Sequence, residues 1–228
     1  MTIKTILITG SNGFIGSGLV SHFNSNPNYH VIVISKGINR VSELNDSQYI
    51  DTDITQNKQV REVFSRIKPD VVIHCAAISQ VDICESNPKL CNDVNVEATE
   101  LIALECEKLN TRLIFLSSDF VFDGTLQFIH DETVPNPISV YGKSKRESEL
   151  NIELNLKDWA IVRPVLVYGF SSASSRTNIF SWVYNSLKEE KTIKVVSDHI
   201  RTPTFIDDVV LLIDQLVKSN GTGYFNIG

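Results

Sequence analysis

A glycine-rich turn close to the N-terminus constrains the fold of this chain more than any other feature. Residues 9–16, of sequence TGSNGFIG, follow a short apolar run at 5–9 and open a segment of helical period at 14–24. Glycines let a backbone turn tightly and approach a pyrophosphate, whose negative charge the N–H groups and dipole of the following helix can hold. A strand, a glycine turn and a helix in this order predict a dinucleotide-binding βαβ unit.

The spacing of the glycines narrows the kind of nucleotide site. Gly10, Gly13 and Gly16 form G-x-x-G-x-x-G, which is one residue longer than the commoner dinucleotide pattern. A P-loop would end in Gly-Lys-Ser or Gly-Lys-Thr, whereas this turn ends in Ile-Gly-Ser, so chemistry on a nucleoside triphosphate is not expected. The residues expected to contact the cofactor here are Gly10, Asn12, Gly13, Phe14, Ile15 and Gly16.

The rest of the chain alternates short apolar runs with longer segments of helical period, which predicts an α/β fold with a doubly wound parallel sheet of the Rossmann type. The expected strands are 5–9, 30–35, 49–53, 71–76, 113–117 and 159–162, and the expected helices are 14–24, 56–68, 88–109 and 140–154. Beyond Pro164 the pattern loosens, with helices expected at 179–190 and 206–218, a strand at 193–196 and a last apolar run at 224–227. We therefore expect a Rossmann domain over residues 1–165 and a small, shortened C-terminal substrate lobe over residues 166–228, interleaved with it.

Composition and charge argue against several other classes of protein. The 228 residues carry 21 basic and 27 acidic side chains, a net charge of −6, and no basic run exceeds two residues, so a nucleic-acid partner is not expected. No apolar stretch approaches the roughly 20 residues of a membrane span. The N-terminus leads straight into a strand, so we expect no signal segment and a cytoplasmic protein. The four cysteines contain no C-x-x-C pair; we expect them to be reduced and mostly buried, and we expect no metal site.

A cation stands where an NAD site usually places an acid. The second expected strand ends near residue 35, about 20 residues beyond the glycine turn, where a carboxylate would bind the ribose 2′-hydroxyl of NAD. This chain has Ser35 and Lys36 there, with Arg40 close behind. A cation favours a 2′-phosphate, which predicts NADP in preference to NAD. Asp53 and Ile54, at the end of the third strand, are expected to meet the adenine.

Tyr141 and Lys145 are spaced four residues apart at the start of an expected helix and therefore share one face of it. A phenol has a pKa near 10 and is a poor acid or base at neutral pH, but a neighbouring ammonium stabilises the phenolate and lowers that pKa. The pair is thus a candidate general acid/base. The same spacing also arises by chance on helix surfaces, so it needs support from a third group.

That third group is a hydroxyl at the carboxyl edge of the sheet. Ser117, Ser118 and Asp119 follow the fifth expected strand, at the edge where doubly wound sheets bind their ligands. A hydroxyl there can hydrogen-bond a substrate carbonyl while Tyr141 protonates it. Both serines are candidates for this role, and either can instead be a turn residue.

With these three sites in this order, the chain resembles the extended short-chain dehydrogenase/reductases, and within them the dTDP-4-dehydrorhamnose reductase (RmlD-like) family. The resemblance covers essentially the whole chain. It rests on the glycine turn, HCAA at 74–77, VDICESNP at 81–88, NVEAT at 95–99, SSDFVFDG at 117–124, the Tyr141/Lys145 pair, RP at 163–164 and RTPTFIDD at 201–208.

The resemblance implies an NAD(P)H-dependent reduction of the 4-keto group of a nucleotide-linked 6-deoxyhexose, as in dTDP-rhamnose biosynthesis. By analogy Tyr141 donates the proton, Lys145 lowers the pKa of Tyr141 and grips the nicotinamide ribose, and Ser118 orients the keto oxygen. Further residues implied by the resemblance are Ala76, Ala77 and Ile78 beside the cofactor, Asp119 with Ser118 at the substrate, and Asn95 as a structural support. Homodimers are common in this superfamily, so a homodimer is a further expectation.

Three features depart from the reductase pattern and leave alternatives open. Where these reductases often carry a tryptophan after Arg-Thr-Ser, this chain has RPVL at 163–166, and Phe14-Ile15 in the glycine turn is closer to the epimerases and dehydratases. The family usually continues by several tens of residues beyond the point matching Gly228, so either the substrate lobe is small or this sequence is a fragment of a longer chain. One alternative is therefore a nucleotide-sugar epimerase or dehydratase with tightly bound NAD, although Asp119-Phe120 supplies one acid where dehydratases tend to place two. Another is a non-catalytic NADP-binding subunit, as in the regulatory β-subunit of methionine adenosyltransferase, a relative of the reductases.

Overall fold

A seven-stranded sheet, in which every neighbouring pair of strands is parallel, forms the centre of the molecule. The computed structural model describes residues 3–126, 128–130, 132–170 and 178–228. In sheet order the strands are β3 (Tyr49–Asp51), β2 (Tyr29–Ser35), β1 (Lys4–Thr9), β4 (Val71–His74), β5 (Arg112–Leu116), β6 (Trp159–Pro164) and β7 (Gly223–Ile227). The strand order reverses between β1 and β4, and the crevice at such a switch point is where doubly wound sheets bind ligands.

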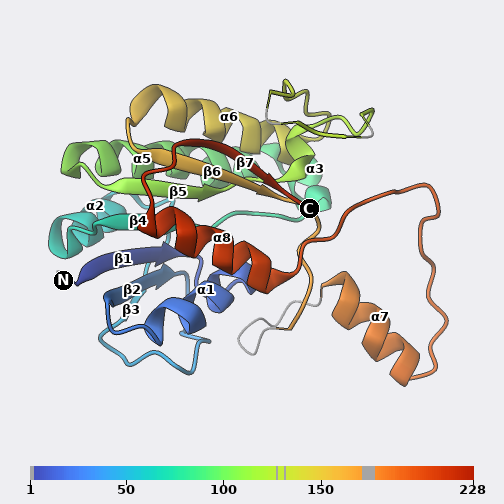
Figure 1. Cartoon of the computed structure of the whole chain (residues 1–228), viewed down its shortest axis with the longest axis horizontal. Coiled ribbons are helices and arrows are strands. Elements are labelled where there is room, and N and C mark those ends of the chain that lie inside the picture. Colours follow the sequence, from blue (N-terminus) through green and yellow to red (C-terminus); the bar gives the residue numbers. More distant parts are fainter. Residues whose placement is uncertain (1–2, 127, 131, 171–177) are drawn as a thin grey trace.

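Helices cover both faces of this sheet (Figure 1). One face carries α1 (Phe14–Asn24) and α8 (Ile206–Lys218), and the other carries α2 (Asn57–Ile67), α5 (Ala98–Leu109) and α6 (Val140–Asn155). Two short helices, α3 (Val81–Ser86) and α4 (Pro88–Cys91), follow β4, and α4 continues through a π-helical turn (Asn92–Glu97) into α5. A 3₁₀ turn (Asp119–Val121) follows β5. The expected doubly wound Rossmann architecture is thus confirmed.

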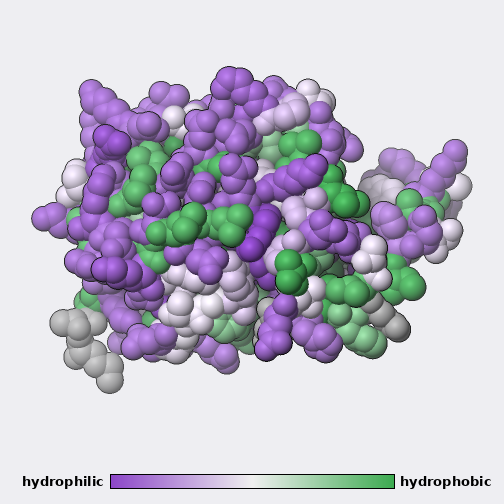
Figure 2. All heavy atoms as spheres, turned by 90° about the horizontal axis from the view of Figure 1, so that it is seen from above, coloured by the Kyte–Doolittle hydropathy of each residue, from purple (hydrophilic) through white to green (hydrophobic). Residues whose placement is uncertain are grey.

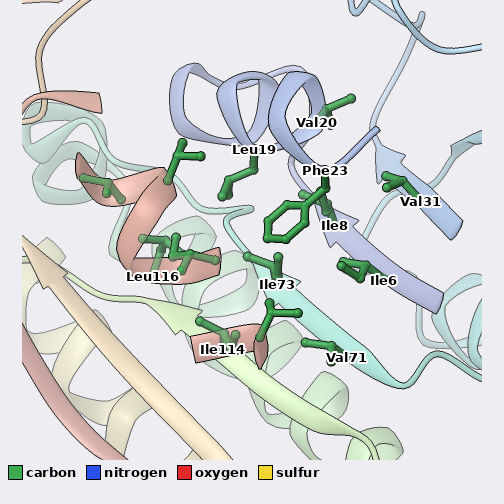
Figure 3. Close-up of a cluster of buried hydrophobic side chains, with 14 of the residues drawn as sticks. Ile6, Ile8, Leu19, Val20, Phe23, Val31, Val71, Ile73, Ile114 and Leu116 are labelled. Atoms are coloured by element: carbon green, nitrogen blue, oxygen red, sulfur yellow. The ribbon is translucent and has the colours of Figure 1, made fainter. Parts of the chain in front are cut away.

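The strands are apolar throughout because both of their faces are buried. Successive side chains of a strand point to opposite faces, so in β1 Ile6 and Ile8 lie in the core under α1 and α8, while Leu7 lies in the core under α2, α5 and α6. Figure 3 shows Leu19 and Phe23 of α1 packed over the first of these cores. Burial on both faces explains the continuous hydrophobic runs that the sequence shows.

The structure differs from the sequence-based expectation in two places. The helix expected over 88–109 is interrupted by the π-helical turn and preceded by α3, which the expectation omitted. The strand expected at 193–196 is wrong: this run is irregular, and Val195 and Val196 are each 62% exposed. An apolar run becomes a strand when it finds a neighbour to pair with, and this one lies away from the sheet.

The C-terminal quarter of the chain divides between the main layers and a projecting part. Strand β7 extends the sheet beside β6, and α8 packs on α1, where Gly18 allows close contact with Ile206. Helix α7 (Ile179–Lys188) instead stands away from the body at the end of a long connection (Figure 1). Figure 2 shows hydrophobic residues among hydrophilic ones at this end of the molecule. Among the described residues, no helix combines the length and the apolar character that crossing a membrane requires.

Candidate active site

The glycine turn has the geometry of a cradle for a bound phosphate. Gly10 has a φ of +72°, and a Cβ atom there would lie 2.7 Å from the backbone nitrogen of Ala76, so a larger residue is excluded on two grounds. A Cβ atom at Gly16 would overlap the carbonyl of Gly10. Gly13 is the N-cap of α1 and offers its first turn no side-chain cap. The exposed N–H groups of a helix start suit an anion, so this region fits the pyrophosphate of a dinucleotide.

A cavity of about 420 Å³ opens beside this turn. Its lining includes eight of the residues expected to bind the cofactor: Gly10, Asn12, Gly13, Lys36, Asp53, Ile54, Ala76 and Ala77. Phe14 and Ile15 instead pack partly against the core beneath α1. Ser35, Arg40, Thr52 and Leu90 also line the cavity. The structure thus brings the turn and the ends of β2 and β4 together around one space.

Asn12 shapes the wall of this cavity through its side-chain amide. Its Nδ2 donates to the carbonyl of Ile38 at 2.9 Å, and its Oδ1 accepts from the backbone nitrogen of Arg40 at 2.9 Å. The same Nδ2 lies 3.3 Å from the hydroxyl of Tyr49. The expected cofactor residue Asn12 therefore fixes the loop that carries Arg40.

Lys36 and Asp53, both expected at the cofactor, form an ion pair with each other. The Lys36 Nζ lies 2.7 Å from the Asp53 Oδ2. Hydrogen bonding to Asp53 raises the pKa of Lys36. Burial raises the pKa of Asp53, but hydrogen bonds from Lys36 and Thr55 outweigh it and lower that pKa overall. Both groups are therefore charged at neutral pH, and both line the cavity.

Ser118 and Tyr141 meet at the carboxyl edge of the sheet. Ser118 caps the 3₁₀ turn that follows β5, and its hydroxyl donates to Asp119 Oδ1 at 3.0 Å. Tyr141 lies in the first turn of α6, which Ser139 caps by accepting from the Gly142 nitrogen at 3.0 Å. Burial raises the pKa of the Tyr141 phenol, and a hydrogen bond with Ser118 acts to lower it.

Lys145 lies one helical turn beyond Tyr141 on α6 and is buried. Its ammonium sits 4.0 Å above the ring centroid of Phe115 and is 2% exposed. Burial lowers the pKa of Lys145 to about 8, while Glu149, Cys75 and Cys91 act to raise it. Ser118 acts against the rise in the pKa of Tyr141 that burial causes, and the role of Lys145 in lowering that pKa stays a prediction.

The two adjacent serines face different partners. The hydroxyl of Ser117 donates to Oε1 of Glu149 at 2.6 Å in a buried network. Ser118 faces Tyr141 and Asp119. Since successive residues of an extended chain point in opposite directions, one serine supports α6 and the other reaches the site.

Asp119 is tied to the C-terminal part of the chain. Its Oδ2 accepts from Nη1 of Arg201 at 2.6 Å, and the guanidinium also lies 4.7 Å from the ring centroid of Phe120. Phe120 in turn packs edge-on against Tyr141, with centroids 5.6 Å apart. Burial raises the pKa of Asp119, and Arg201 acts to lower it. The RTPTFIDD stretch gave the only sequence signal for Arg201.

A buried hydrogen-bonded chain that sequence reasoning missed links the glycine turn to the middle of the fold. Nδ1 of His74 lies 2.6 Å from the Thr9 hydroxyl, and Nε2 lies 2.9 Å from the Thr99 hydroxyl. Thr99 donates to the Asn95 carbonyl at 2.6 Å, so its oxygen accepts from Nε2–H, and Nδ1 accepts from Thr9. Burial lowers the pKa of His74 to about 3, which keeps the ring neutral.

Asn95 extends this series of hydrogen bonds to the segment after β4. Its Oδ1 accepts from the Ile78 nitrogen at 2.8 Å, and its Nδ2 donates to the Ile78 carbonyl at 3.0 Å and to Ser144 at 3.0 Å. Asn95 lies in the π-helical turn, and such turns are frequent at functional sites. Its amide joins the segment carrying Ile78 to helix α6.

Comparison with known proteins gives a matching family model and two similar relatives. The sequence matches the family model described as RmlD substrate binding domain over residues 4–226. It is 34% identical over 222 residues to methionine adenosyltransferase 2 subunit beta of Xenopus tropicalis, covering 94% of this chain and 62% of that one. It is 31% identical over 222 residues to the "Probable low-salt glycan biosynthesis reductase Agl14" of Haloferax volcanii, covering 96% of this chain and 73% of that one.

A solved structure also matches this chain. The crystal structure of dTDP-4-dehydrorhamnose reductase from Bacillus anthracis in complex with NADP matches with a TM-score of 0.86 at 27% identity, covering 100% of this chain and 75% of that one. The chain thus spans about three quarters of that reductase and 62% of the methionine adenosyltransferase subunit.

Proposed function

The chain belongs to the RmlD substrate binding domain family, and we propose that it is an NADP-dependent reductase of a 4-keto nucleotide sugar. One arrangement carries this proposal: the hydroxyl of Ser118 acts on the phenol of Tyr141, and Lys145 lies one helical turn further along α6. Carbonyl reduction needs a hydride at the carbon and a proton at the oxygen of one C=O bond. A phenol beside a hydroxyl and a buried ammonium suits the delivery of that proton.

The glycine turn and its cavity are the proposed dinucleotide site. The N-terminus of α1 suits the pyrophosphate, and Lys36 with Arg40 suits a 2′-phosphate on the ribose. The NADP bound by the Bacillus anthracis reductase supports this assignment. NAD is expected to bind less tightly, because it lacks the phosphate that the two cations would contact.

The chemistry follows from the side chains at the edge of the sheet. When bound and reduced, the nicotinamide supplies the hydride for the carbonyl carbon. Ser118 donates a hydrogen bond to the carbonyl oxygen, and Tyr141 transfers its phenolic proton to that oxygen, so that the ketone becomes an alcohol. Lys145 stabilises the phenolate that remains. The raised pKa of the free phenol keeps Tyr141 protonated before substrate arrives, as a proton donor must be.

A nucleotide sugar is the proposed substrate, with Asp119 beside Ser118 as its contact. The names of two relatives, a dTDP-4-dehydrorhamnose reductase and a glycan biosynthesis reductase, support a sugar with a keto group. We also propose the homodimer that is common among short-chain dehydrogenase/reductases.

The decisive experiment measures NADPH oxidation against a panel of 4-keto nucleotide sugars. We expect turnover with at least one of them and a loss of about a thousandfold in kcat for Tyr141→Phe. Tyr29→Phe, at the start of β2 and therefore at the edge of the sheet opposite the site, is the matched control and should leave turnover unchanged. An absence of turnover with every sugar would overturn the proposal.

The choice of cofactor has its own test. Lys36→Ala should weaken NADPH binding by about tenfold and leave NADH binding nearly unchanged, since NADH carries no 2′-phosphate. Lys58→Ala, on the exposed face of α2, should change neither. Tightly bound NAD in the purified protein would instead favour the epimerase or dehydratase alternative.

A second function is favoured by one observation, the 34% identity to a methionine adenosyltransferase subunit. The chain would then bind NADP as part of a larger enzyme without using it for catalysis. Cells lacking this protein separate the two functions. If wild type and Tyr141→Phe restore growth equally while both bind NADPH, the protein acts as a subunit; if the variant fails, catalysis is required.

A further inference from the structure

A fully buried carboxylate lies directly behind the site. Glu149, on α6, has no exposed surface and accepts four hydrogen bonds. Arg163 binds it through two nitrogens, each at 2.8 Å, Arg146 contributes a third bond at 3.0 Å and Ser117 a fourth at 2.6 Å. A buried charge is costly unless it is paired in this way, so the position of Glu149 is strongly determined.

Arg163, which forms an ion pair with Glu149, is itself held in place on the sheet. Arg163 lies in β6 and is buried, with 3% of its surface exposed. Its guanidinium lies 4.1 Å from the ring centroid of Tyr224 in β7. The Glu149–Arg163 pair therefore ties α6 to the edge of the sheet formed by β6 and β7. Through Ser117 it also reaches the residue before Ser118.

Glu149 lies on the same side of α6 as the two groups proposed to react. Tyr141, Lys145 and Glu149 follow one another at intervals of four residues, which places them along one stripe of the helix. The charged and titratable groups that face Lys145 come from three elements. They are His74 of β4 and Cys75 after it, Cys91 of α4, and Glu149 of α6.

Among these groups Glu149 has the largest effect in favour of the charged lysine. Burial lowers the pKa of Lys145 to about 8, and Glu149 is the first of the groups that oppose this shift. His74 is neutral, and burial raises the pKa of Cys75 to about 12, so neither supplies a negative charge at neutral pH. The carboxylate of Glu149, although it also pairs with Arg146 and Arg163, is thus the negative charge that most favours the charged form of Lys145.

We propose that Glu149, held by Arg163 and Ser117, is the positioning residue of this site and keeps the Lys145 ammonium charged at neutral pH. This inference rests on the proposed reductase function, in which Lys145 must carry a proton to stabilise the phenolate. A purely structural ion pair would anchor α6 to β6 without affecting the protonation of Lys145. The two roles predict different titrations.

The test is a direct titration of Lys145 in the protein without added cofactor, using lysine labelled with ¹³C at Cε and ¹⁵N at Nζ. The Lys145 resonance is identified by its loss in Lys145→Met. In Glu149→Gln we expect its titration midpoint to fall by about one pH unit or more. The matched control is Glu153→Gln, one turn further along α6, where an exposed carboxylate accepts from the Tyr224 hydroxyl. Its midpoint should equal that of wild type.

Two further variants keep the test decisive if Glu149→Gln does not fold. The paired change of Glu149→Gln with Arg163→Met removes both buried charges, a replacement that proteins often tolerate. Loss of the Glu149 carboxylate lowers the midpoint, and loss of the Arg163 cation acts in the opposite direction, so the midpoint should still fall but by less than in Glu149→Gln. Glu149→Asp keeps the charge and should restore most of the wild-type midpoint.

Turnover measurements then separate this inference from the function on which it rests. The protonated lysine is the active form, so a lower pKa means that kcat/KM declines at lower pH in Glu149→Gln than in wild type. Equal midpoints in wild type, Glu149→Gln and the paired variant overturn the role of Glu149 whether or not the enzyme turns over. A shifted midpoint without turnover on any sugar leaves the electrostatic role of Glu149 intact and overturns the reductase.

Discussion

Arg201 and Asp119 form an ion pair across 82 residues of sequence, with Nη1 and Oδ2 2.6 Å apart. Through it the segment that precedes α8 reaches the residue next to Ser118. The guanidinium also covers Phe120, which packs edge-on against Tyr141. The C-terminal quarter of the chain therefore completes the wall of the site.

Loss of this ion pair should weaken substrate binding. Arg201→Gln removes the charge that acts against burial at Asp119, so the pKa of Asp119 should rise further and its carboxylate should lose the partner that holds it in place. We expect KM for the sugar to rise about fivefold, the effect of a partly exposed pair, with cofactor affinity unchanged. Steady-state kinetics with Arg201→Lys as the charge-preserving control tests this, and an unchanged KM in Arg201→Gln contradicts it.

Gly10 of the glycine turn and Gly223 of β7 both have a positive φ, so the effect of an alanine can be compared at the two positions. A Cβ atom at Gly10 meets the Ala76 backbone at 2.7 Å, whereas one at Gly223 has no atom within 4 Å. Gly223→Ala should therefore cost only the backbone penalty of about 1–3 kcal/mol. Gly10→Ala should cost more, and it should also abolish dinucleotide binding because the cradle opens.

Chemical denaturation and titration with NADPH measure both effects. Equal losses of stability in the two variants, with NADPH binding retained in Gly10→Ala, would show that close approach to Ala76 does not matter.

Burial of a charged lysine should make Lys145 a source of instability. Its pKa is lowered from 10.5 to about 8, so between these values the unfolded chain binds more protons, and stability contributed by this group rises with pH. Lys145→Met should therefore stabilise the fold at pH 7, by up to about 3 kcal/mol, while turnover is lost. The gain in Tm should shrink as the pH is raised from about 8 towards 10, and a gain independent of pH contradicts the argument.

The neutral state of His74 should make the fold sensitive to acid. Burial holds the folded pKa near 3, against 6.5 for the unfolded chain, so protons bind preferentially to the unfolded state between these values. Stability is therefore lost as the pH falls below 6.5, at up to about 1.4 kcal/mol per pH unit.

Urea unfolding at pH 7 and pH 4.5 tests the role of His74. In His74→Asn the fold should be weaker at pH 7, because the bonds to Thr9 and Thr99 are changed, but its decline towards pH 4.5 should be shallower than in wild type. His30→Asn, at an exposed position of β2, should reproduce the wild-type decline. A decline as steep in His74→Asn as in wild type assigns the acid sensitivity to other groups.

The sequence predicts the layers of this fold because its signals are periodic. Apolar runs such as 71–74 and the helical period of 206–218 can be recognised in the sequence without knowledge of the packing. The glycine turn is recognisable because close approach of the backbone excludes a larger residue at Gly10. The run at 193–196 has the same local character, but whether it pairs depends on a neighbouring strand that sequence does not specify.

The candidate site shows the same division between local and distant information. The spacing of Tyr141 and Lys145 predicts that they share a face, and the topology brings Ser118 to them. The direction of the Lys145 ammonium, over Phe115, follows from packing between α6 and β5. Likewise the bond from Glu149 to Arg163 requires the register of a helix on a strand. Such contacts cannot be read from spacing alone.

The pairing of α1 with α8 has a consequence for how the protein is made. These helices share one core, in which Phe23 and Ile213 are both fully buried, and Lys4 donates to the carbonyl of Val217 at 3.1 Å. A ribosome adds about 5–20 residues per second, so roughly 10–40 s separate the synthesis of α1 from that of α8. During this interval the nascent chain exposes one apolar face of its growing sheet. Its emergence from the ribosome is therefore the stage at which a chaperone has most to protect.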